Sequence, residues 1–375
     1  MTRHAPQPLY APAPEPSGGP SRGSEPARAQ AQPNRLSALL AERDWLLADG
    51  ATGTALFAMG LEPGAPPELW NVDRPDRIRA LYQSAVDAGS DLFLTNTFGG
   101  TAARLALHEA QGRVAELNRA GAELAREVAD RAGRPIVVAG SMGPTGELLE
   151  PVGALSQAAA VALFHEQAEA LKAGGADVLW VETISAAEEF AAAAEAARLA
   201  DMPWCGTMSF DTAGRTMMGL TAADLTARVA ALPHGPLAFG ANCGVGASDL
   251  LRTVLSFAAA DPDRPLIAKG NAGIPKFVEG HIHYDGTPEL MADYAVLARD
   301  SGARIIGGCC GTTAQHLRAM RTALETRPNG PPPGLERIAA ALGPFSSESD
   351  GSVAGVGAGS GPGATSDRPR RRRRG

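Results

Sequence analysis

An apolar run of strand character followed by a run of helical character recurs eight times along this chain of 375 residues. Short uninterrupted apolar strands that alternate with helices are typical of a parallel sheet whose faces are covered by helices. Eight such units match one closed (β/α)8 barrel, and an open doubly wound sheet is the alternative. We therefore predict an α/β fold built as a single TIM barrel, without a second domain.

The positions of these elements follow from the pattern. The predicted strands are 45–48, 92–95, 136–139, 178–181, 204–208, 237–240, 266–269 and 304–306. The predicted helices are 76–88, 101–132 with a break, 156–173, 185–200, 221–232, 248–260, 288–300 and 313–326. Ser185, Ser248 and Thr313 are the predicted N-caps of three of these helices.

The two ends of the chain differ from this repeat. Residues 1–34 are rich in Pro, Ala, Gln and Ser, and residues 346–375 are rich in Gly and Ser with a terminal run of arginines, so both are predicted to be disordered tails. We assign 35–330 to the barrel domain and 331–345 to a short helical extension. The formal charge is −7 and the last nine residues contribute +5, so residues 1–366 carry −12. An arginine tail without interleaved aromatic residues is usually solvated, and a nucleic-acid partner is not expected.

The compartment follows from the cysteine count and the hydropathy. Four cysteines in 375 residues are few for a secreted scaffold held by disulfides. The first thirty residues contain no apolar core of the kind that a signal peptide needs. No apolar run approaches the roughly 18 residues that span a bilayer. We therefore expect a cytoplasmic protein with reduced thiols and no membrane partner.

Three of the four cysteines lie in glycine-rich segments directly after predicted strands. Cys243 is part of GANCG, and Cys309 and Cys310 are part of GGCCG. A bridge between the adjacent pair would be strained, because consecutive Cα atoms lie about 3.8 Å apart and a relaxed disulfide needs roughly 4.4–6.8 Å. A bridge from Cys243 to either one remains open. We interpret the three thiols as metal ligands rather than core residues, because flanking glycines let the backbone approach a site closely. Cys205 is assigned to the core.

Three thiolates suit a soft or borderline metal, and Zn²⁺ is the expected ion. Three protein ligands leave a fourth tetrahedral position, which marks a catalytic site. Three thiolates weaken the Lewis acidity of zinc toward water but suit a fourth thiolate from a substrate. A free thiol with a pKa near 8.5 is mostly protonated at neutral pH, and zinc coordination deprotonates it. We therefore predict that Cys243, Cys309 and Cys310 are both the metal ligands and the catalytic residues.

Further motifs follow other predicted strands, and in a barrel the carboxyl ends of all strands meet at one face. These motifs are DGATGT from Asp49, TNTFGG from Thr95, GSMGPTG from Gly140, ET at Glu182 and GNAG from Gly270. Together with GANCG and GGCCG they resemble the homocysteine S-methyltransferase family over about residues 36–330. The resemblance implies a barrel in which the three cysteines bind zinc, homocysteine supplies the fourth sulfur, and methyl transfer yields methionine.

The same resemblance implies the substrate-binding residues. Asp49 and Glu182 would meet the amino group of homocysteine, and Gly50 and Thr97 would lie near its carboxylate. The residue types agree, because a zwitterionic amino acid needs carboxylates for its ammonium and backbone or hydroxyl donors for its carboxylate. Each has a structural alternative: Asp49 and Thr97 could cap turns, and Glu182 could be an ion-pair partner. Asn271 matches a position near zinc in cobalamin-dependent relatives, or it is a turn residue.

The methyl donor is indicated less directly. The overall pattern is similar to bacterial betaine–homocysteine methyltransferases, and several motifs resemble the homocysteine module of cobalamin-dependent methionine synthase. Methylated ammonium donors are recognised by aromatic cages. Animal betaine enzymes have aromatic residues where this chain has Thr183 and Gly99, so a cage here would have to use Trp70, Trp180 or Tyr284. We predict betaine or a related methylated onium compound as the donor.

The alternatives belong to other classes. In a split methionine synthase, the methyl group would come from a separate corrinoid protein, because we expect no corrinoid or folate domain in this chain. A metal-dependent hydrolase would use His281 and His283, which form an HxH pair in the predicted loop after the seventh strand, where a solvated pair is expected. A non-catalytic subunit would bind homocysteine or zinc alone. The pattern defines no oligomeric state.

Overall fold

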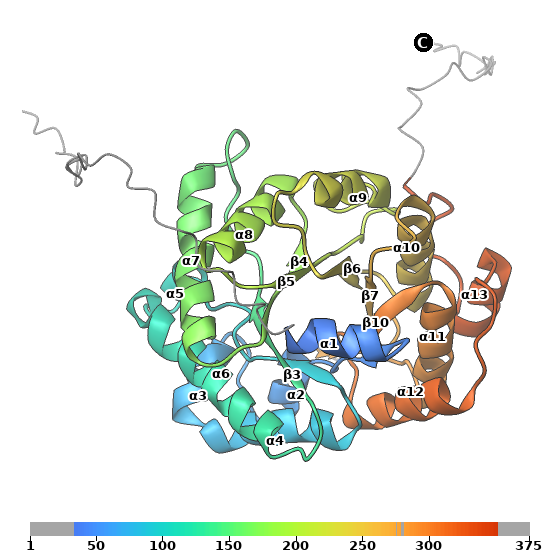
Figure 1. Cartoon of the computed structure of the whole chain (residues 1–375), viewed down its shortest axis with the longest axis horizontal. Helices are drawn as coiled ribbons and strands as arrows, with labels where there is room; N and C mark the ends of the chain where they lie inside the picture. Colours follow the sequence, from blue (N-terminus) through green and yellow to red (C-terminus); the bar gives the residue numbers. More distant parts are fainter. Residues whose placement is uncertain (1–33, 275, 279–280, 352–375) are drawn as a thin grey trace, which may run out of the picture. The chain divides into compact units, whose positions relative to one another are not determined.

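The computed structural model of the chain describes residues 34–274, 276–278 and 281–351, and for 276–278 and 281–283 it describes the backbone alone. Residues 1–33 and 352–375, which include most of the two predicted tails, lie outside the described residues. From residue 34 onward, eight parallel strands form a barrel with helices around it (Figure 1). The predicted (β/α)8 barrel is confirmed.

All eight predicted strands are present. They are β1 Leu46–Leu47, β2 Leu92–Leu94, β3 Val137–Met142, β4 Val178–Ile184, β5 Trp204–Met208, β6 Ala238–Cys243, β7 Leu266–Gly270 and β10 Ala303–Gly308. They are ordered β1-β10-β7-β6-β5-β4-β3-β2 around the sheet. Strands β3, β4, β6 and β10 run two or three residues further than predicted. Several polar motifs that we expected in loops therefore form the strand ends themselves.

All eight predicted helical segments are also present, one of them divided into two helices, and the described residues contain four further helices. In chain order the thirteen helices of the described residues are α1 Arg35–Glu42, α2 Gly53–Ala58, α3 Trp70–Asp73, α4 Pro75–Asp87, α5 Ala102–Ala106, α6 Val114–Asp130, α7 Gln157–Ala173, α8 Ala187–Leu199, α9 Ala222–Ala231, α10 Ala247–Ala260, α11 Pro288–Asp300, α12 Ala314–Thr326 and α13 Leu335–Leu342. The expected break in 101–132 separates α5 from α6. No helix in the described part of the chain is long and apolar enough to cross a membrane.

The strands β1 and β2 meet at the seam of the barrel, where the described strands are not joined by a ladder. Two aspartates bridge this seam. Asp91 accepts a hydrogen bond from the N–H of Leu47 at 2.9 Å, and its own N–H donates to the Leu47 carbonyl at 2.7 Å. Asp49 accepts from the N–H of Leu94 at 2.8 Å. These bonds satisfy buried backbone groups that a ladder would otherwise pair.

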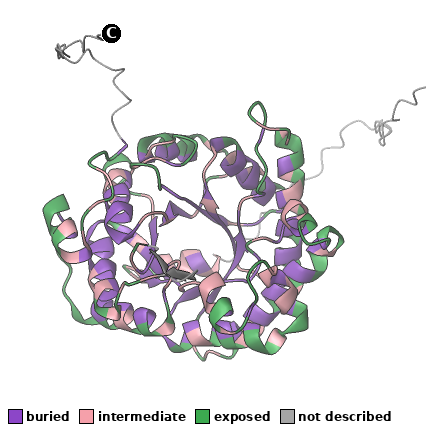
Figure 2. Cartoon of the chain, turned by 180° about the vertical axis from the view of Figure 1, so that it is seen from behind, coloured by how far each residue is buried: buried purple, intermediate pink, exposed green. Residues whose placement is uncertain are grey.

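The interior of the barrel changes character along its strands. Its amino-terminal part is apolar, and Leu36 and Leu39 of α1 pack into the same cluster, so α1 closes this end (Figure 1). Because inward positions recur every second residue, Val178 and Trp180 in the apolar cluster place Glu182 on the same inner face of β4. The polar inward side chains near the carboxyl ends are Ser141, Glu182, Thr207, Asn242 and Lys269, all buried. Figure 2 shows the buried strands inside and the exposed residues on the outer helix faces and loops.

Two of the three predicted helix caps are wrong. Thr313 is the N-cap of α12, as predicted. Ser185 precedes Ala186, which is the N-cap of α8, and no side chain caps that helix. Ser248 lies inside α10, because the helix already begins at Ala247 after the extended Gly246. Ser and Thr are common in first turns as well as at caps, and the apolar pattern does not separate these positions.

The segment after the seventh barrel strand forms a hairpin. The strands β8 Lys276–Val278 and β9 His281–His283 pair in antiparallel register. The prediction that His281 and His283 lie in an irregular loop is therefore wrong, since both belong to β9. Their side chains lie outside what the structure describes, and the predicted HxH metal pair is not tested.

The segment after α13 packs on the barrel. The predicted helical extension contains α13, and the chain then continues along α10. The N–H of Ser346 donates to Asp249 at 3.0 Å, and Arg252 donates to the carbonyl of Ser347 at 2.8 Å. The guanidinium of Arg252 also lies over the ring of Phe345, 4.7 Å from its centroid. Ordered contacts therefore extend past the position at which composition placed the start of the second tail.

Candidate metal centre and substrate site

Three cysteine sulfurs meet at the carboxyl-terminal face of the barrel. Cys243 is the last residue of β6, and Cys309 and Cys310 directly follow β10. The three Sγ atoms lie within 4.8 Å of one another, with 3.9 Å between those of Cys243 and Cys310. All three are free thiols, so the bridge that the sequence left open is not formed. Sulfurs bound to one tetrahedral zinc at about 2.3 Å lie about 3.8 Å apart, and this spacing therefore suits a single ion.

The backbone around the sulfurs is held in an unusual conformation. Cys243 has a φ of 60°, in the left-handed region that non-glycine residues seldom adopt. Asn271 braces this turn, because its Nδ2 donates to the carbonyl of Gly244 at 2.9 Å and its Oδ1 accepts from the N–H of Cys310 at 3.0 Å. Both polar atoms of Asn271 thus bond the two cysteine segments to each other.

The charge of three adjacent sulfurs needs compensation. Hydrogen bonds from Cys243 and Cys309 lower the pKa of Cys310 to about 3, while the same contacts raise the pKa of Cys243. One thiolate is therefore stabilised by two neighbouring thiols. Ionising all three at this spacing requires a nearby cation, because like charges in a buried site repel strongly. This is the donor chemistry of a soft or borderline divalent metal ion.

A buried cation lies in the polar layer beside the sulfurs. Lys269 on β7 is 1% exposed, and its Nζ forms an ion pair with Asp49. The same Nζ lies 5.8 Å from the ring centroid of Trp180. Burial alone would lower the pKa of Lys269, but Asp49 and Glu182 outweigh it, and the pKa is raised. The sequence prediction did not assign a role to Lys269, although a lysine at the inner end of a barrel strand is a signal for one.

Glu182 lies in β4 rather than after it. Its Oε1 accepts a hydrogen bond from the hydroxyl of Ser141 at 2.5 Å. Burial raises the pKa of Glu182 to about 7, against the opposing charge of Lys269. The register between β4 and β5 shifts between Val181 and Ile184, which is the signature of a bulge at Glu182. The carboxyl of Glu182 therefore changes charge near neutral pH.

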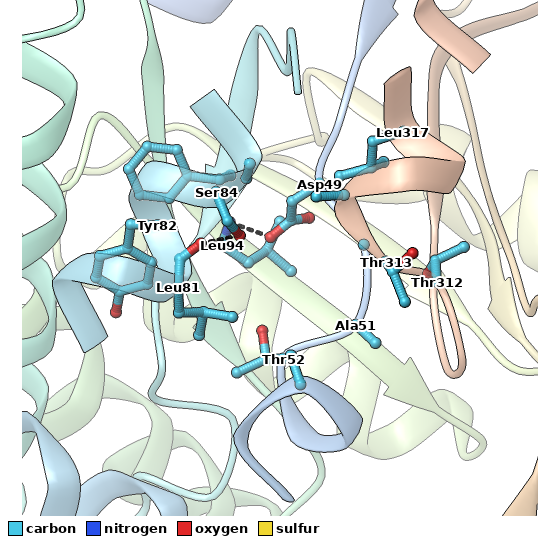
Figure 3. A pocket seen from close by; sticks show the side chains of 15 residues that line it. Asp49, Ala51, Thr52, Leu81, Tyr82, Ser84, Leu94, Thr312, Thr313 and Leu317 are labelled. Carbon is cyan, nitrogen blue, oxygen red and sulfur yellow. Dashed lines mark hydrogen bonds between the residues drawn. The ribbon is translucent and has the colours of Figure 1, made fainter. Parts of the chain in front are cut away.

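Gly50 and Thr97 lie in different environments. A cavity of about 50 Å³ is lined by Asp49 and Gly50 together with residues of α2, α4 and α12, and Figure 3 shows the bond from Asp49 to Leu94 beside it. A Cβ at Gly50 would lie 3.0 Å from the carbonyl of Thr312, so only glycine fits there without a shift. Thr97 is fully buried and its hydroxyl donates to the carbonyl of Ser141 at 2.7 Å. The predicted contact of Thr97 with substrate stays a prediction.

Comparison with known proteins identifies the family. The family model described as homocysteine S-methyltransferase matches residues 46–324. The chain belongs to the homocysteine S-methyltransferase family. This family assignment favours methyl transfer over the hydrolase that the sequence left as an alternative.

The chain is similar to two curated methionine synthases. It is 30% identical to the methionine synthase of Mycobacterium tuberculosis over 298 residues, which cover 74% of this chain and 24% of the relative. It is 30% identical to that of Mycobacterium leprae over 314 residues, 78% of this chain and 25% of the relative. The chain thus spans about a quarter of the length of these curated relatives.

Among solved structures, the homocysteine methyltransferase MmuM from Escherichia coli is similar along almost its whole length. Its oxidized form has a TM-score of 0.64 and 29% identity, with 77% of this chain and 99% of that chain covered. Its metallated form has a TM-score of 0.64 and 28% identity, with the same coverage. Each of these two structural matches covers about three quarters of the present chain.

The aromatic residues considered for a donor cage have different partners. The ring of Trp70 lies 5.7 Å from the guanidinium carbon of Arg77. The ring of Trp180 faces Lys269 inside the barrel, as described above. Tyr284 lies at the sulfurs, where its ring is next to Gly311 and its hydroxyl is hydrogen-bonded with Cys310. The two tryptophans are therefore already paired with cations of the protein itself.

Proposed function

We propose that the protein is a zinc-dependent homocysteine S-methyltransferase that produces methionine. The observation that carries the proposal is the meeting of three cysteine sulfurs within 4.8 Å of one another at the carboxyl-terminal face of the barrel. Support comes from the family assignment and from the metallated form of a similar structure.

The three cysteines and the residues around them have different roles in this proposal. Cys243, Cys309 and Cys310 would hold the zinc ion, which when bound keeps the thiol of homocysteine ionised at neutral pH. Asn271 fixes the distance between the two cysteine segments through its bonds to Gly244 and Cys310. The thiolate of the substrate is then the nucleophile that accepts the methyl group.

The charges of the polar layer support an amino acid as the substrate. Asp49 and Glu182 provide two carboxylates, and Lys269 provides one buried cation. An incoming ammonium group would balance the second carboxylate. Since Lys269 already forms an ion pair with Asp49, we assign the main contact with the substrate ammonium to Glu182 in its ionised form. Asp49 would share its carboxylate between Lys269 and the ammonium. Gly50, which directly follows Asp49, would lie near the carboxylate end of the substrate.

For the methyl donor we propose betaine or a related methylated onium compound. Tyr284 at the sulfurs is the aromatic residue placed to face such a cation. A second candidate is the homocysteine-methylating subunit of a split cobalamin-dependent methionine synthase, with the methyl group arriving on a corrinoid protein. The observation that favours it is the similarity to one quarter of two much longer methionine synthases.

One set of assays tests these proposals. Purified protein is analysed for metal, and methionine formation from homocysteine is measured with betaine and, separately, with a methylcorrinoid protein. We expect one zinc per chain and turnover with betaine. Turnover only with the methylcorrinoid protein would select the second candidate, and full activity in protein stripped of metal would contradict the zinc proposal.

A further inference from the structure

A single buried amide joins four strands at the candidate site. Asn242 on β6 is 1% exposed. Its Oδ1 accepts from the N–H of Thr183 on β4 at 2.9 Å and from the hydroxyl of Thr207 on β5 at 2.7 Å. Its Nδ2 donates to the hydroxyl of Thr183 at 2.8 Å and lies 3.8 Å from the Sγ of Cys309, which follows β10. All four hydrogen-bonding positions of the amide are thus used.

The orientation of this amide is determined by its partners. The backbone N–H of Thr183 can only donate, so the atom of Asn242 that faces it must be the carbonyl oxygen. The NH₂ group is then directed at the hydroxyl of Thr183 and at the sulfur of Cys309. A reversed amide would place two donors against each other and an oxygen against the sulfur of Cys309.

The first partner of Asn242 is a strained residue. Thr183 has a φ of 62°, in the left-handed region, which is a genuine outlier for a β-branched side chain. Such conformations persist only where the surroundings hold them. Asn242 holds both the N–H and the hydroxyl of Thr183, and this residue lies in the bulge next to the inward-facing Glu182.

The second partner is one of the three clustered sulfurs. Groups that hydrogen-bond to metal-binding residues orient them and tune their basicity. An N–H donor directed at Cys309 draws electron density from that sulfur and fixes its rotamer. The amide of Asn242 therefore touches both the segment that carries the substrate carboxylate and the segment that carries the metal ligands.

We infer that Asn242 is a positioning residue that couples the Glu182 bulge to the Cys309 sulfur, so that one amide sets both the substrate contact and the donor strength of the metal site. The inference rests on the proposed function and deepens it. Asn242 touches neither the substrate nor the reacting atoms, and it acts through Thr183 and Cys309.

The test uses the full-length protein loaded with cobalt, whose sulfur-to-metal charge-transfer band reports on the thiolate donors. Asn242→Asp keeps the shape of the side chain and its acceptors but removes both donors. We expect the affinity for the metal, measured by competition with a chelator, to fall about 10- to 100-fold. We also expect the cobalt band to shift and the KM for homocysteine to rise about tenfold.

A matched control separates this role from loss of stability. Asn71 is another buried asparagine, whose Nδ2 donates to the carbonyls of Asn96 and Leu117 at 2.8 and 3.0 Å, away from the sulfurs. Asn71→Asp removes two donor bonds in the same way. We expect it to lower the unfolding midpoint while leaving the cobalt band and the metal affinity unchanged.

A second substitution separates the two partners of Asn242. Glycine adopts the left-handed region without penalty, so Thr183→Gly in the Asn242→Asp background should restore the bulge. We expect the KM for homocysteine to recover to within about threefold of that of Thr183→Gly alone, because glycine holds the turn without Asn242. The cobalt band should stay shifted, because the donor to Cys309 is still missing.

The outcomes are distinguishable. A folded Asn242→Asp variant with wild-type metal affinity, an unshifted band and an unchanged KM overturns the inference. If Asn242→Asp does not fold, Thr183→Gly in the wild-type background still tests the inference. Glycine holds the turn without the hydroxyl bond to Asn242, so the KM should stay within about threefold of the wild-type value and the band should stay unshifted, and a shifted band would overturn the inference. Wild-type protein that takes up no cobalt overturns the proposed function as well.

Discussion

The two aspartates at the seam of the barrel have opposite surroundings. Asp91, near the amino-terminal end, meets Arg43 at 2.6 Å, Arg321 at 3.0 Å and Arg134 at 3.7 Å. Among the side chains that the structure describes, Asp49, near the carboxyl-terminal end, meets a single cation, Lys269. Both carboxylates accept a hydrogen bond from the backbone of the neighbouring strand, so both help to close the barrel.

The balance of charge differs between these two ends. Around Asp91, Glu325 also bonds Arg321, which gives three cations for two carboxylates. Around Asp49, Glu182 is the second carboxylate and Lys269 is the one cation. The cluster around Asp91 already has more cations than carboxylates. The cluster around Asp49 has more carboxylates than cations and can accept one further positive charge. The comparison indicates that the amino-terminal cluster stabilises the fold and that the carboxyl-terminal cluster binds an ammonium group.

The largest effect is expected from the three clustered sulfurs at the carboxyl-terminal end. Cys310→Ala removes one of three donors, and we expect loss of bound zinc and a fall in kcat/KM of at least about a thousandfold, or about 4 kcal/mol. Metal analysis and steady-state kinetics check this. Cys205→Ala is the control, because Cys205 is fully buried in the apolar part of the barrel and should leave the zinc content unchanged.

The next effect is on stability. Asp91→Asn leaves three arginines around an uncharged side chain, and we expect the free energy of unfolding to fall by about 3 kcal/mol. Urea denaturation measures it, with Asp293→Asn as the control, since the exposed pair of Asp293 with Arg327 should contribute less than about 1 kcal/mol. The KM of the folded Asp91→Asn enzyme should stay unchanged. A large rise in KM would contradict the assignment of the amino-terminal cluster to stability and of the carboxyl-terminal cluster to substrate binding.

A smaller effect concerns the pH dependence of substrate binding. The pKa of Glu182 is raised to about 7 by burial, so the carboxyl is mostly protonated at pH 6 and mostly ionised at pH 8. Since the ionised form binds the ammonium, affinity should rise with pH, and the KM for homocysteine should fall about tenfold from pH 6 to pH 8. Glu182→Gln should raise the KM and flatten this part of the profile. A wild-type profile identical to that of Glu182→Gln would argue against the assigned contact.

The smallest effect is a shift of that profile. Lys269 lowers the pKa of Glu182 by its charge, so Lys269→Met should raise this pKa. The pH at which KM reaches half of its change should then move upward by about half a unit to one unit. Kinetics across pH 6 to 9 would show the shift, provided that circular dichroism confirms folding. If the midpoint of the profile moves to lower pH instead, the account in which the charge of Lys269 lowers the pKa of Glu182 is contradicted.

The apolar pattern was sufficient for the fold. Each barrel strand has a buried core of apolar residues, so all eight were predicted. Their carboxyl ends were missed in β3, β4, β6 and β10, because inward positions there carry polar groups such as Ser141 and Glu182 that interrupt the pattern. The hairpin β8–β9 was missed because its strands, KFV and HIH, contain a lysine and two histidines, so no uninterrupted apolar run marks them.

The site was predicted unevenly. The three cysteines could be brought together from sequence, because each follows a predicted strand and barrel strands end at one face. Lys269 and Asn242 could not, because their roles depend on neighbours from strands far apart in the chain. An alternation rule predicts that both point inward, but it does not say that Lys269 meets Asp49 or that Asn242 reaches Thr183 and Cys309 across an intervening strand.

The central claim is that three protein sulfurs hold one zinc ion and leave a place for the sulfur of homocysteine. X-ray absorption at the zinc edge of the purified protein tests it directly, before and after homocysteine is added. We predict three sulfur neighbours at about 2.3 Å in the free protein and four in the presence of homocysteine. Protein without zinc, or a sulfur count that homocysteine does not change, would contradict the account.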